Sequence, residues 1–346
     1  MKSKNVFLIF LIFLFLNDIY ADEQISIGLD KENRDCENIT RDTLQEKSFS
    51  RDLVGTFNGK KVEYTASLKE KIIYEKDNPN LPMASFFYTE YISKSNNQRP
   101  VIFSFNGGPG SASLWLHMGV LGPKVIKVPS DATDDGSPPY NIIDNKLSPL
   151  SDADLVFIDP VGTGYSRAIG CHEGEEFWGV SEDPKIIAEF IRRWITDNKR
   201  WNSPRYILGE SYGGIRGPLL VSELRSGSIT PIEVNGLLLV APASDYQYLV
   251  FHPGNNSPHY GFLPSYAATA FYHGKVKSNK TLKDFYLESK KFSLEEYAQN
   301  HPAGSIGKKI MLKVEDLMLV GSKVPTCQTE DILSDAILEL TEKQCG

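Results

Sequence analysis

Four short apolar runs, each followed by residues that favour turns, constrain the fold of this 346-residue chain most strongly. Continuous apolar runs of this length are typical of strands that are buried on both faces, as in a parallel sheet. Helical patterns lie between the second and third runs and after the third, and this alternation predicts an α/β fold. Ligands of such sheets bind beyond the carboxyl ends of the strands. The four runs are Pro100–Phe105, Leu155–Ile158, Tyr206–Leu208 and Gly236–Val240.

Other patterns complete the predicted core and the segment after it. β-Branched and aromatic residues predict strands at Val62–Ser67 and Met83–Ser93. Ser181 is expected to cap a helix whose apolar residues recur at helical spacing as far as Trp194. Beyond the last apolar run the strand pattern weakens, and helical periodicity predicts a helical insertion above the sheet. The expected domains are residues 57–244 for the α/β core and residues 245–346 for the helical insertion and a C-terminal remnant.

Residues 1–21 have the pattern of a secretory signal peptide. Two lysines make a positive start, Val6–Leu16 is continuously apolar, and Ala21 is a small residue before the expected cleavage point. The apolar run is too short to cross roughly 30 Å of hydrocarbon, so no stable membrane span is expected after signal removal. The pattern therefore predicts a secreted or periplasmic protein in which residues 22–56 form a mobile polar leader.

Export would bring the four cysteines into an oxidising environment, where disulfides form. No two of them have the close spacing of a zinc site, so disulfides are the favoured use, and no metal or cofactor is expected. Four cysteines allow three pairings, and the sequence does not choose between them. The cysteines are Cys36, Cys171, Cys327 and Cys345.

The net charge of −7, from 37 basic and 44 acidic side chains, argues against nucleic acid as a partner. There is also no cluster of lysine and arginine that would suggest a membrane-surface patch. Three N-x-S/T patterns mark sites that could carry glycans in a secreted protein: Asn38, Asn255 and Asn279.

The stretch Gly209–Gly213 matches the pattern G-x-S-x-G. It follows an apolar run and precedes a helical pattern, which is the strand–turn–helix setting of a nucleophile elbow. Glycines allow the chain to bend tightly there and to push the Ser211 hydroxyl out above the sheet. The simpler alternative is an exposed serine in a glycine-rich turn.

A second glycine-rich stretch, Asn106–Ser111, ends another apolar run. Backbone N–H groups in such a loop can point at an oxyanion that develops during acyl transfer. The competing interpretation is a phosphate-binding loop. It is disfavoured because the terminal Gly-Lys-Ser/Thr is absent and Gly-x-Gly-x-x-Gly is not matched.

Three blocks in this order resemble the signature blocks of the serine carboxypeptidases. The resemblance implies an α/β-hydrolase fold, with a mostly parallel sheet, helices on both faces and a helical insertion. It also implies a serine protease that removes single residues from peptides with a free C-terminus, usually at acid pH. The three blocks are Asn106–Ser111, Asp159–Ser166 and Gly209–Gly214.

The resemblance also implies a role for each matching residue. Ser211 would be the catalytic nucleophile, and the backbone N–H groups of Gly108 and Tyr212 would form the oxyanion hole. A carboxyl group can donate a hydrogen bond to a carboxylate only when it is protonated, so binding would be best in acid. The substrate's terminal carboxylate would be held by Asn106, Gly107 and Glu210.

The chain departs from the family pattern near this site and downstream of it. Ser104 stands where the family usually has tryptophan, and Val120 where it often has glutamate. The blocks that carry the family's catalytic aspartate and histidine do not follow Ser211, so the last strands of the sheet and the acid–base pair are expected to be missing. Four histidines do follow the serine, and surface or structural roles are favoured for them: His252, His259, His273 and His301.

Three functions remain open on this basis. The first is a serine carboxypeptidase by descent whose present chain is truncated, and therefore incomplete or weakly active. The second is a non-catalytic homologue that binds peptides. The third is another serine acyl-transfer enzyme, an esterase or acyltransferase, with an unrecognised histidine as its base.

Overall fold

A computed structural model describes residues 39–95, 98–127, 138–251, 255, 257–276 and 278–297. The predicted signal peptide and the chain from residue 298 onward lie outside the described residues. Internal contacts divide the chain into two compact units, Met1–Pro242 and Ala243–Gly346. The domain boundaries expected from the sequence stay predictions, apart from the end of the expected leader, which a strand crosses.

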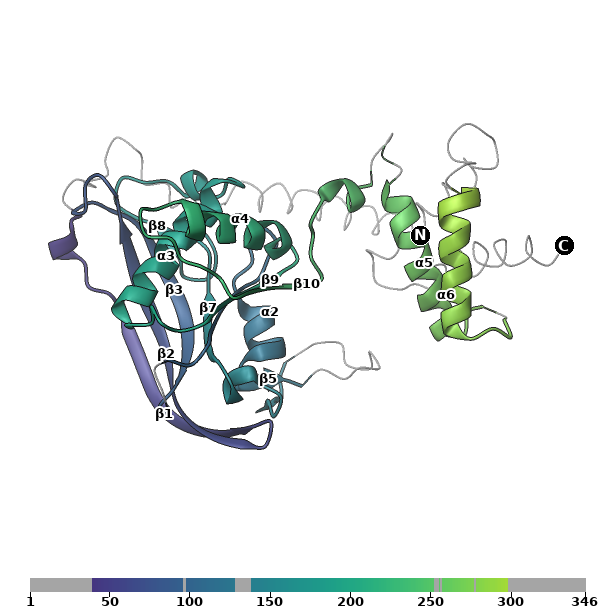
Figure 1. The fold of residues 1–346 in the computed structure, drawn as a ribbon, viewed down its shortest axis with the longest axis horizontal. Coiled ribbons are helices and arrows are strands. Elements are labelled where there is room, and N and C mark those ends of the chain that lie inside the picture. Colours follow the sequence, from purple (N-terminus) through teal and green to yellow (C-terminus); the bar gives the residue numbers. More distant parts are fainter. Residues whose placement is uncertain are drawn as a thin grey trace, which may run out of the picture. The chain divides into compact units, whose positions relative to one another are not determined.

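The first unit is built on one twisted sheet with the strand order β1-β2-β3-β7-β4-β9-β10 (Figure 1). Four of these strands are parallel neighbours, and they are the four apolar runs that predicted the α/β fold, so that prediction is confirmed. Their bounds are β4 (Val101–Phe105), β7 (Asp154–Ile158), β9 (Arg205–Glu210) and β10 (Gly236–Val240).

Antiparallel strands extend the other side of the sheet. The strand β3 (Pro82–Ser93) pairs with β7 and with β2 (Lys60–Tyr74), and both strands contain the stretches predicted as strands. The short strand β8 (Arg167–Ala168) also pairs with β3. A separate two-stranded sheet is formed by β5 (Lys124–Ile126) and β6 (Ile142–Asp144).

The strand β1 (Ser48–Phe57) corrects one expectation, because it begins inside the stretch predicted to be a mobile leader. It pairs with β2 from Ser48 to Phe57. Most of its side chains are exposed, and polar and apolar residues do not alternate along it, so no strand pattern marks it in the sequence. Backbone hydrogen bonds to β2 hold β1 in place along its whole length. The periodicity of side chains in the sequence does not indicate such backbone pairing.

Alternate residues of the parallel strands enter two hydrophobic clusters on opposite faces of the sheet. In β7, Val156 and Ile158 belong to one cluster and Leu155 and Phe157 to the other. Because successive side chains of a strand point to opposite faces, this confirms that the strand is buried on both sides. The first face is covered by α3 (Glu182–Asp197) and α4 (Gly213–Ser226), and the second by α2 (Leu114–Leu116) and by the chain near Leu150.

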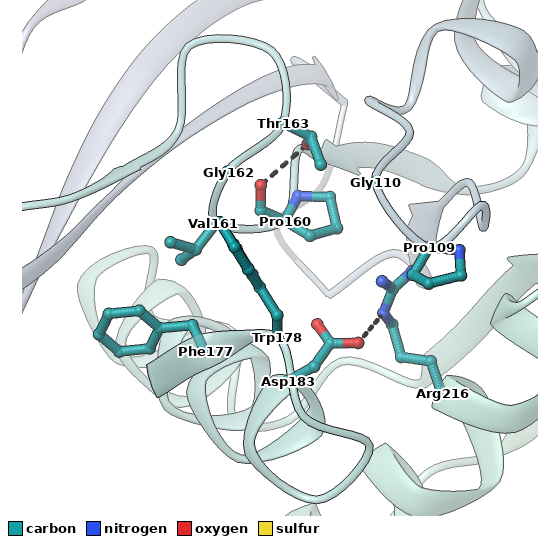
Figure 2. A pocket seen from close by; sticks show the side chains of 10 residues that line it. All are labelled: Pro109, Gly110, Pro160, Val161, Gly162, Thr163, Phe177, Trp178, Asp183 and Arg216. Atoms are coloured by element: carbon teal, nitrogen blue, oxygen red, sulfur yellow. Dashed lines mark hydrogen bonds and ion pairs between the residues drawn. The ribbon is translucent and has the colours of Figure 1, made fainter. Parts of the chain in front are cut away.

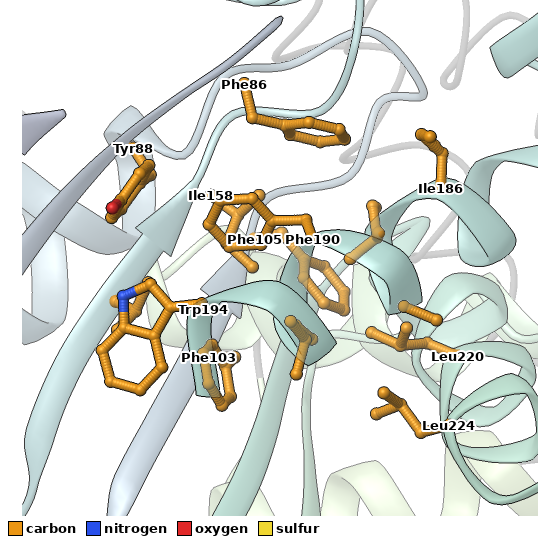
Figure 3. Close-up of a cluster of buried hydrophobic side chains, with 14 of the residues drawn as sticks. Phe86, Tyr88, Phe103, Phe105, Ile158, Ile186, Phe190, Trp194, Leu220 and Leu224 are labelled. Carbon is orange, nitrogen blue, oxygen red and sulfur yellow. The ribbon is translucent and has the colours of Figure 1, made fainter. Parts of the chain in front are cut away.

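The larger cluster joins the helices α3 and α4 to the sheet (Figure 3). Ser181 precedes α3 as predicted, but its side chain accepts no capping hydrogen bond, so burial of the apolar face holds the helix. Each large side chain buried here contributes roughly 1.5–3 kcal/mol. The cluster includes Phe86, Phe103, Phe105, Ile158, Phe190, Trp194, Leu220 and Leu224.

Short helical turns connect these elements. Cys171 lies near one of them and is disulfide-bonded, and the other three cysteines lie outside the described residues. The turns of the first unit are Arg41–Thr43, His117–Leu121, Pro149–Ser151 and Gly174–Phe177.

The second unit is helical, as the periodicity after the last strand predicted. It contains α5 (Ser257–Tyr272) and α6 (Leu282–Phe292), with turns at Tyr246–Tyr248 and Ser293–Tyr297. Thr281 caps α6, and its hydroxyl accepts from the backbone N–H of Asp284 at 3.1 Å. Among the described residues, none of the helices combines the length and the apolar character that spanning a bilayer requires.

Candidate active site

Ser211 lies on a sharp turn between β9 and α4. Its backbone φ is +58°, in the left-handed region that costs a residue with a side chain roughly 1–2 kcal/mol. The turn is held by two backbone hydrogen bonds: the Ser211 N–H donates to the Val240 carbonyl at 3.0 Å, and the Gly214 N–H donates to the Ser211 carbonyl at 2.8 Å. A Cβ on Gly209 would come within 2.5 Å of the Gly213 carbonyl oxygen, so a side chain there would prevent the turn from closing. The local geometry is the strand–turn–helix arrangement that the G-x-S-x-G pattern predicted.

The glycine-rich loop after β4 meets this turn. Because β4 and β9 are parallel neighbours, their carboxyl ends lie side by side. The Asn106 side-chain amide donates to Glu210 Oε2 at 3.0 Å, and the Gly107 N–H approaches the same oxygen at 3.4 Å. The structure therefore brings together the three residues that the family resemblance implied for carboxylate binding.

Gly107 is pressed against the backbone of the serine turn. A Cβ added to it would lie 2.3 Å from the Tyr212 nitrogen and 2.6 Å from the Glu210 carbonyl oxygen. The next residue, Gly108, has a φ of +108°, and its N–H donates to no acceptor within the described part of the chain. The two backbone amides implied for the oxyanion hole thus lie on adjoining stretches of chain.

Asn106 is buried, and neighbouring elements fix both of its oxygens. Its side-chain oxygen accepts from the Leu116 N–H at 3.1 Å, and its carbonyl accepts from Arg216 Nη1 at 2.7 Å. Arg216 in turn donates through Nε to Asp183 on α3 at 2.6 Å, and its guanidinium lies 5.1 Å from the centre of the Tyr212 ring. Burial raises the pKa of Asp183, although Arg216 opposes that shift.

The Asp183–Arg216 pair was not predicted from the sequence. Both residues carry a charge at a helix position that the structure buries. Because a charged side chain is almost never buried without a partner, two opposite charges on the inward faces of neighbouring helices could have indicated the pair. Deciding which face of α4 was inward required knowledge of the packing.

The second signature block forms a compact loop at the end of β7. Asp159 Oδ1 accepts from the Ser113 N–H at 2.8 Å, and burial raises the pKa of Asp159. Gly164 has a φ of +51°, and a Cβ there would lie 2.2 Å from Asp159 Oδ2. The Ser166 hydroxyl accepts from the Phe87 N–H at 2.8 Å and donates to the Asp159 carbonyl at 2.7 Å. Through Asp159 this block fixes Ser113, a residue between the glycine-rich loop and α2.

The two positions that depart from the family pattern differ in environment. Ser104 is fully buried in β4, and its hydroxyl has no hydrogen-bond partner within the described ranges. Val120 is exposed, and its backbone carbonyl accepts from the Asn145 side chain at 2.8 Å. Neither side chain can supply the hydrogen bonds or charge of the residue that the family usually has there.

No histidine side chain bonds the Ser211 hydroxyl among the residues that the structure describes. His117 instead contacts the Tyr91 hydroxyl at 2.7 Å and stacks on Phe157, and burial lowers its pKa to about 4. Burial also lowers the pKa of His172, but hydrogen bonds to two glutamates outweigh it and raise that pKa above its usual value. His259 and His273 lie in the second unit, and the other two downstream histidines are outside the described residues.

The comparisons with known proteins agree with this geometry. The family model for serine carboxypeptidases matches residues 74–289, which is more than half of the chain. Serine carboxypeptidase-like 2 of Arabidopsis thaliana is 26% identical over 260 residues, covering 71% of this chain and 52% of the relative. Serine carboxypeptidase-like 13 of the same plant is 30% identical over 164 residues, covering 46% of this chain and 36% of the relative.

A solved structure is similar over a comparable share. The prohormone-processing carboxypeptidase Kex1Δp from Saccharomyces cerevisiae has 19% identity and a TM-score of 0.41, covering 70% of this chain and 49% of that one. The chain spans about half the length of curated relatives such as serine carboxypeptidase-like 2. Its mixed sheet, which is parallel from β7 to β10 and antiparallel on the other side, the helices on both faces and the serine turn are those of an α/β-hydrolase fold. Because the family model matches more than half of the chain, the protein is a member of the serine carboxypeptidase family.

Proposed function

We propose that Ser211 is the nucleophile of a serine-type carboxypeptidase, which hydrolyses C-terminal residues from peptides through an acyl-enzyme. One observation carries this proposal. The strained serine turn adjoins the glycine-rich loop, and the two are joined by the hydrogen bonds from Asn106 and Gly107 to Glu210. A serine nucleophile and a binding group for a terminal carboxylate would then lie on one edge of the sheet.

The proposed oxyanion hole consists of the N–H groups of Gly108 and Tyr212. The support for it is the close approach of Gly107 to the Tyr212 nitrogen, which only a glycine allows. Two donors held in place before the reaction stabilise a tetrahedral intermediate because they need no reorganisation, and loss of one such donor typically costs about 10²–10³ in rate. Both donors are backbone groups, so their positions depend on the loop and not on side-chain rotamers.

Substrate recognition is proposed to use the same three residues that already bond one another. The side-chain amide of Asn106 and the N–H of Gly107 donate to Glu210, and the same two groups can donate to a substrate carboxylate that lies beside it. The proposal therefore implies tighter binding of a peptide with a free C-terminus than of its C-terminal amide.

Catalysis also requires a base for the serine hydroxyl. Within the described ranges no histidine bonds the Ser211 hydroxyl, and a serine hydroxyl that no base reaches is a poor nucleophile. We propose that the protein acts on the secretory route that its N-terminal pattern predicts.

Labelling with a fluorophosphonate probe tests the nucleophile. We expect slow covalent labelling that is abolished in Ser211→Ala and kept in Ser222→Ala, an exposed serine on the helix α4 that follows the turn. Equal labelling of Ser211→Ala and the wild type, with the modified peptide mapped elsewhere, would refute the assignment.

A non-catalytic peptide-binding role is the second candidate. It is favoured by one observation: the carboxylate-binding group is assembled, whereas the Ser211 hydroxyl has no side-chain partner within the described residues. If the wild type is not labelled but binds a peptide with a free C-terminus more tightly than its amide, this role replaces the first. Equal affinity for the acid and the amide, together with no labelling, would exclude both.

A further inference from the structure

A cavity of about 330 Å³ lies beside the glycine-rich loop and has neither Ser211 nor Glu210 in its wall (Figure 2). Pro109 contributes to the wall from the loop, and Val161 from the block after β7. The wall also includes Phe177, Trp178, Asp183 and Arg216. The cavity is therefore adjacent to the candidate active site but distinct from it.

Trp178 is 53% exposed, and two glycines pack closely against its indole. A Cβ on Gly162 would lie 2.7 Å from the indole nitrogen, and one on Gly174 would lie 2.4 Å from its six-membered ring. Gly162 also has a φ of +88°, which disfavours any other residue there. Two glycines thus bring backbone against the ring, and the ring contributes a pre-formed apolar wall. A large exposed aromatic side chain of this kind is typical of a ligand site.

The floor of the cavity is the Asp183–Arg216 ion pair. The two side chains are only 8% and 2% exposed, and together they carry no net charge. Arg216 uses Nε for Asp183 and Nη1 for the Asn106 carbonyl, and Asp183 uses Oδ2 for Arg216. Within the described residues, Asp183 Oδ1 and Arg216 Nη2 make no hydrogen bond. Figure 2 shows the second oxygen of Asp183 directed away from Arg216.

This floor discriminates between ligands by charge. A cation drawn to Asp183 meets the charge of Arg216, and an anion drawn to Arg216 meets that of Asp183, so a charged ligand gains little. A neutral group that carries both a donor and an acceptor can bond both residues. A carboxamide has these two functions side by side.

We propose that this cavity binds a neutral carboxamide attached to an aromatic or other apolar group. The amide carbonyl accepts from Arg216, the amide N–H donates to Asp183, and the apolar group packs against Trp178. Because Arg216 also holds the Asn106 carbonyl, the bound ligand stiffens the glycine-rich loop. The proposal does not require Ser211 to be a nucleophile.

Four probes that share one phenyl group test the proposal on the full chain: phenylacetamide, phenylacetate, 2-phenylethylamine and toluene. Ligand-observed NMR titration is expected to give phenylacetamide a dissociation constant of about 1 mM, typical for a ligand of its size. The charged probes and toluene are expected to bind at least about tenfold more weakly, since phenylacetate lacks the donor, protonated 2-phenylethylamine lacks the acceptor and toluene lacks both. A charged probe that binds as tightly as phenylacetamide, or absence of saturable phenylacetamide binding, overturns the proposal.

Two tryptophan variants test whether phenylacetamide binds in this cavity. Trp178→Ala removes a half-exposed ring and is expected to weaken phenylacetamide binding about tenfold with an unchanged far-UV spectrum. Trp201→Ala, which removes a tryptophan outside the cavity, is the matched control and is expected to leave binding unchanged. Binding unaffected by Trp178→Ala refutes the site.

Glu210→Gln tests whether phenylacetamide binds in this cavity or at the serine site, because Glu210 belongs to the serine site and is not in the cavity wall. It is expected to leave phenylacetamide binding as in the wild type, and loss of binding in it would assign the ligand to the serine site and overturn the proposal. None of these measurements uses turnover or covalent labelling, so failure of the proposed peptidase function would not affect their outcome.

Discussion

Two residues set the local geometry of the candidate active site by opposite means. Ser211 keeps a side chain in a left-handed conformation that disfavours one, and the backbone hydrogen bonds around it hold that strain. Gly107 lacks a side chain where none fits, because backbone atoms of Tyr212 and Glu210 occupy the space. Backbone atoms of a packed turn cannot move aside as a flexible side chain can, so position 107 tolerates little change.

Gly107→Ala tests this close approach. The added methyl group would collide with the Tyr212 nitrogen, and we expect the unfolding free energy to fall by about 1–3 kcal/mol, the usual cost of overpacking. Urea denaturation measures the change. Gly119→Ala is the matched control, because a Cβ there meets no atom within 4 Å and the φ of Gly119 is not positive. A loss in Gly107→Ala no larger than in the control would contradict the argument.

His117 makes stability depend on pH. Its pKa in the folded protein is about 4, against 6.5 in an unfolded chain. The unfolded chain therefore binds a proton more readily, and acid favours unfolding. We expect the contribution of His117 to be complete above about pH 6.5 and to fall by roughly 3 kcal/mol as the pH drops to about 4.

Chemical denaturation at several pH values measures this dependence, and His117→Gln provides the comparison. Glutamine can still hydrogen-bond the Tyr91 hydroxyl but does not titrate. The difference between wild type and variant should shrink steadily between pH 6.5 and 4. A difference that is constant across this window would show that His117 is not buried in its neutral form.

At the scale of elements, the side chain of Trp194 anchors α3 to the sheet. Its ring makes an apolar contact there, and its N–H group makes a hydrogen bond. Trp194 is fully buried and packs edge-on against Phe103. Its indole N–H donates to Glu90 Oε2 at 2.8 Å, and Lys69 pairs with the other oxygen at 2.6 Å. The indole N–H thus provides a hydrogen-bond donor for one of the two carboxylate oxygens of Glu90, which is buried on β3. This contact joins the helix to the strand, so each stabilises the other.

Trp194→Phe is expected to lower the unfolding free energy by about 2–4 kcal/mol. The variant loses ring volume and leaves one oxygen of the buried Glu90 without a donor. Trp201→Phe, at a partly exposed tryptophan, should change stability by less than about 0.5 kcal/mol. Thermal and urea unfolding of both variants give the comparison, and similar losses in the two would refute the anchoring role.

At the scale of the whole molecule, the part of the sheet that the structure describes ends at an apolar strand, β10. Within the described residues this strand pairs with β9 alone, and its last four residues, Leu237–Val240, are 38–42% exposed. Leu237 and Leu239 face α4, because both approach Gly217, so Leu238 lies on the opposite face. Unpaired apolar edge strands promote association between molecules.

Leu238→Lys tests the edge as an association site. We expect sedimentation velocity to show association of the wild type that increases with concentration and is reduced in the variant, because a charge on an edge strand opposes pairing. Ile229→Lys, at a fully exposed residue outside the sheet, controls for the added charge. Equal reduction in the two variants would mean that net charge, and not the edge, governs association.

The sequence by itself determined the parallel strands, the helices beside them and the turn at Ser211. Each of these has a local signature: an apolar run, a recurrence at helical spacing, or a glycine pair around a serine. Local signatures suffice because strand and helix are set by neighbours within a few residues. The strand β1 has no such signature, since most of its side chains face solvent, and the sequence therefore predicted a leader there.

The family resemblance implied that Asn106, Gly107 and Glu210 act at one site, but only the tertiary structure decided the contacts that join them and the residues that support them. Glu210 bonds Asn106 across 104 positions of sequence, and Arg216 bonds the Asn106 carbonyl across 110. The order of strands in the sheet creates these contacts, and periodicity within one strand contains no information about its neighbours. The buried pair of Asp183 and Arg216 depends further on which faces of α3 and α4 turn inward. Such choices are made by packing over the whole molecule, because a buried charge is stable only where a partner from another element reaches it.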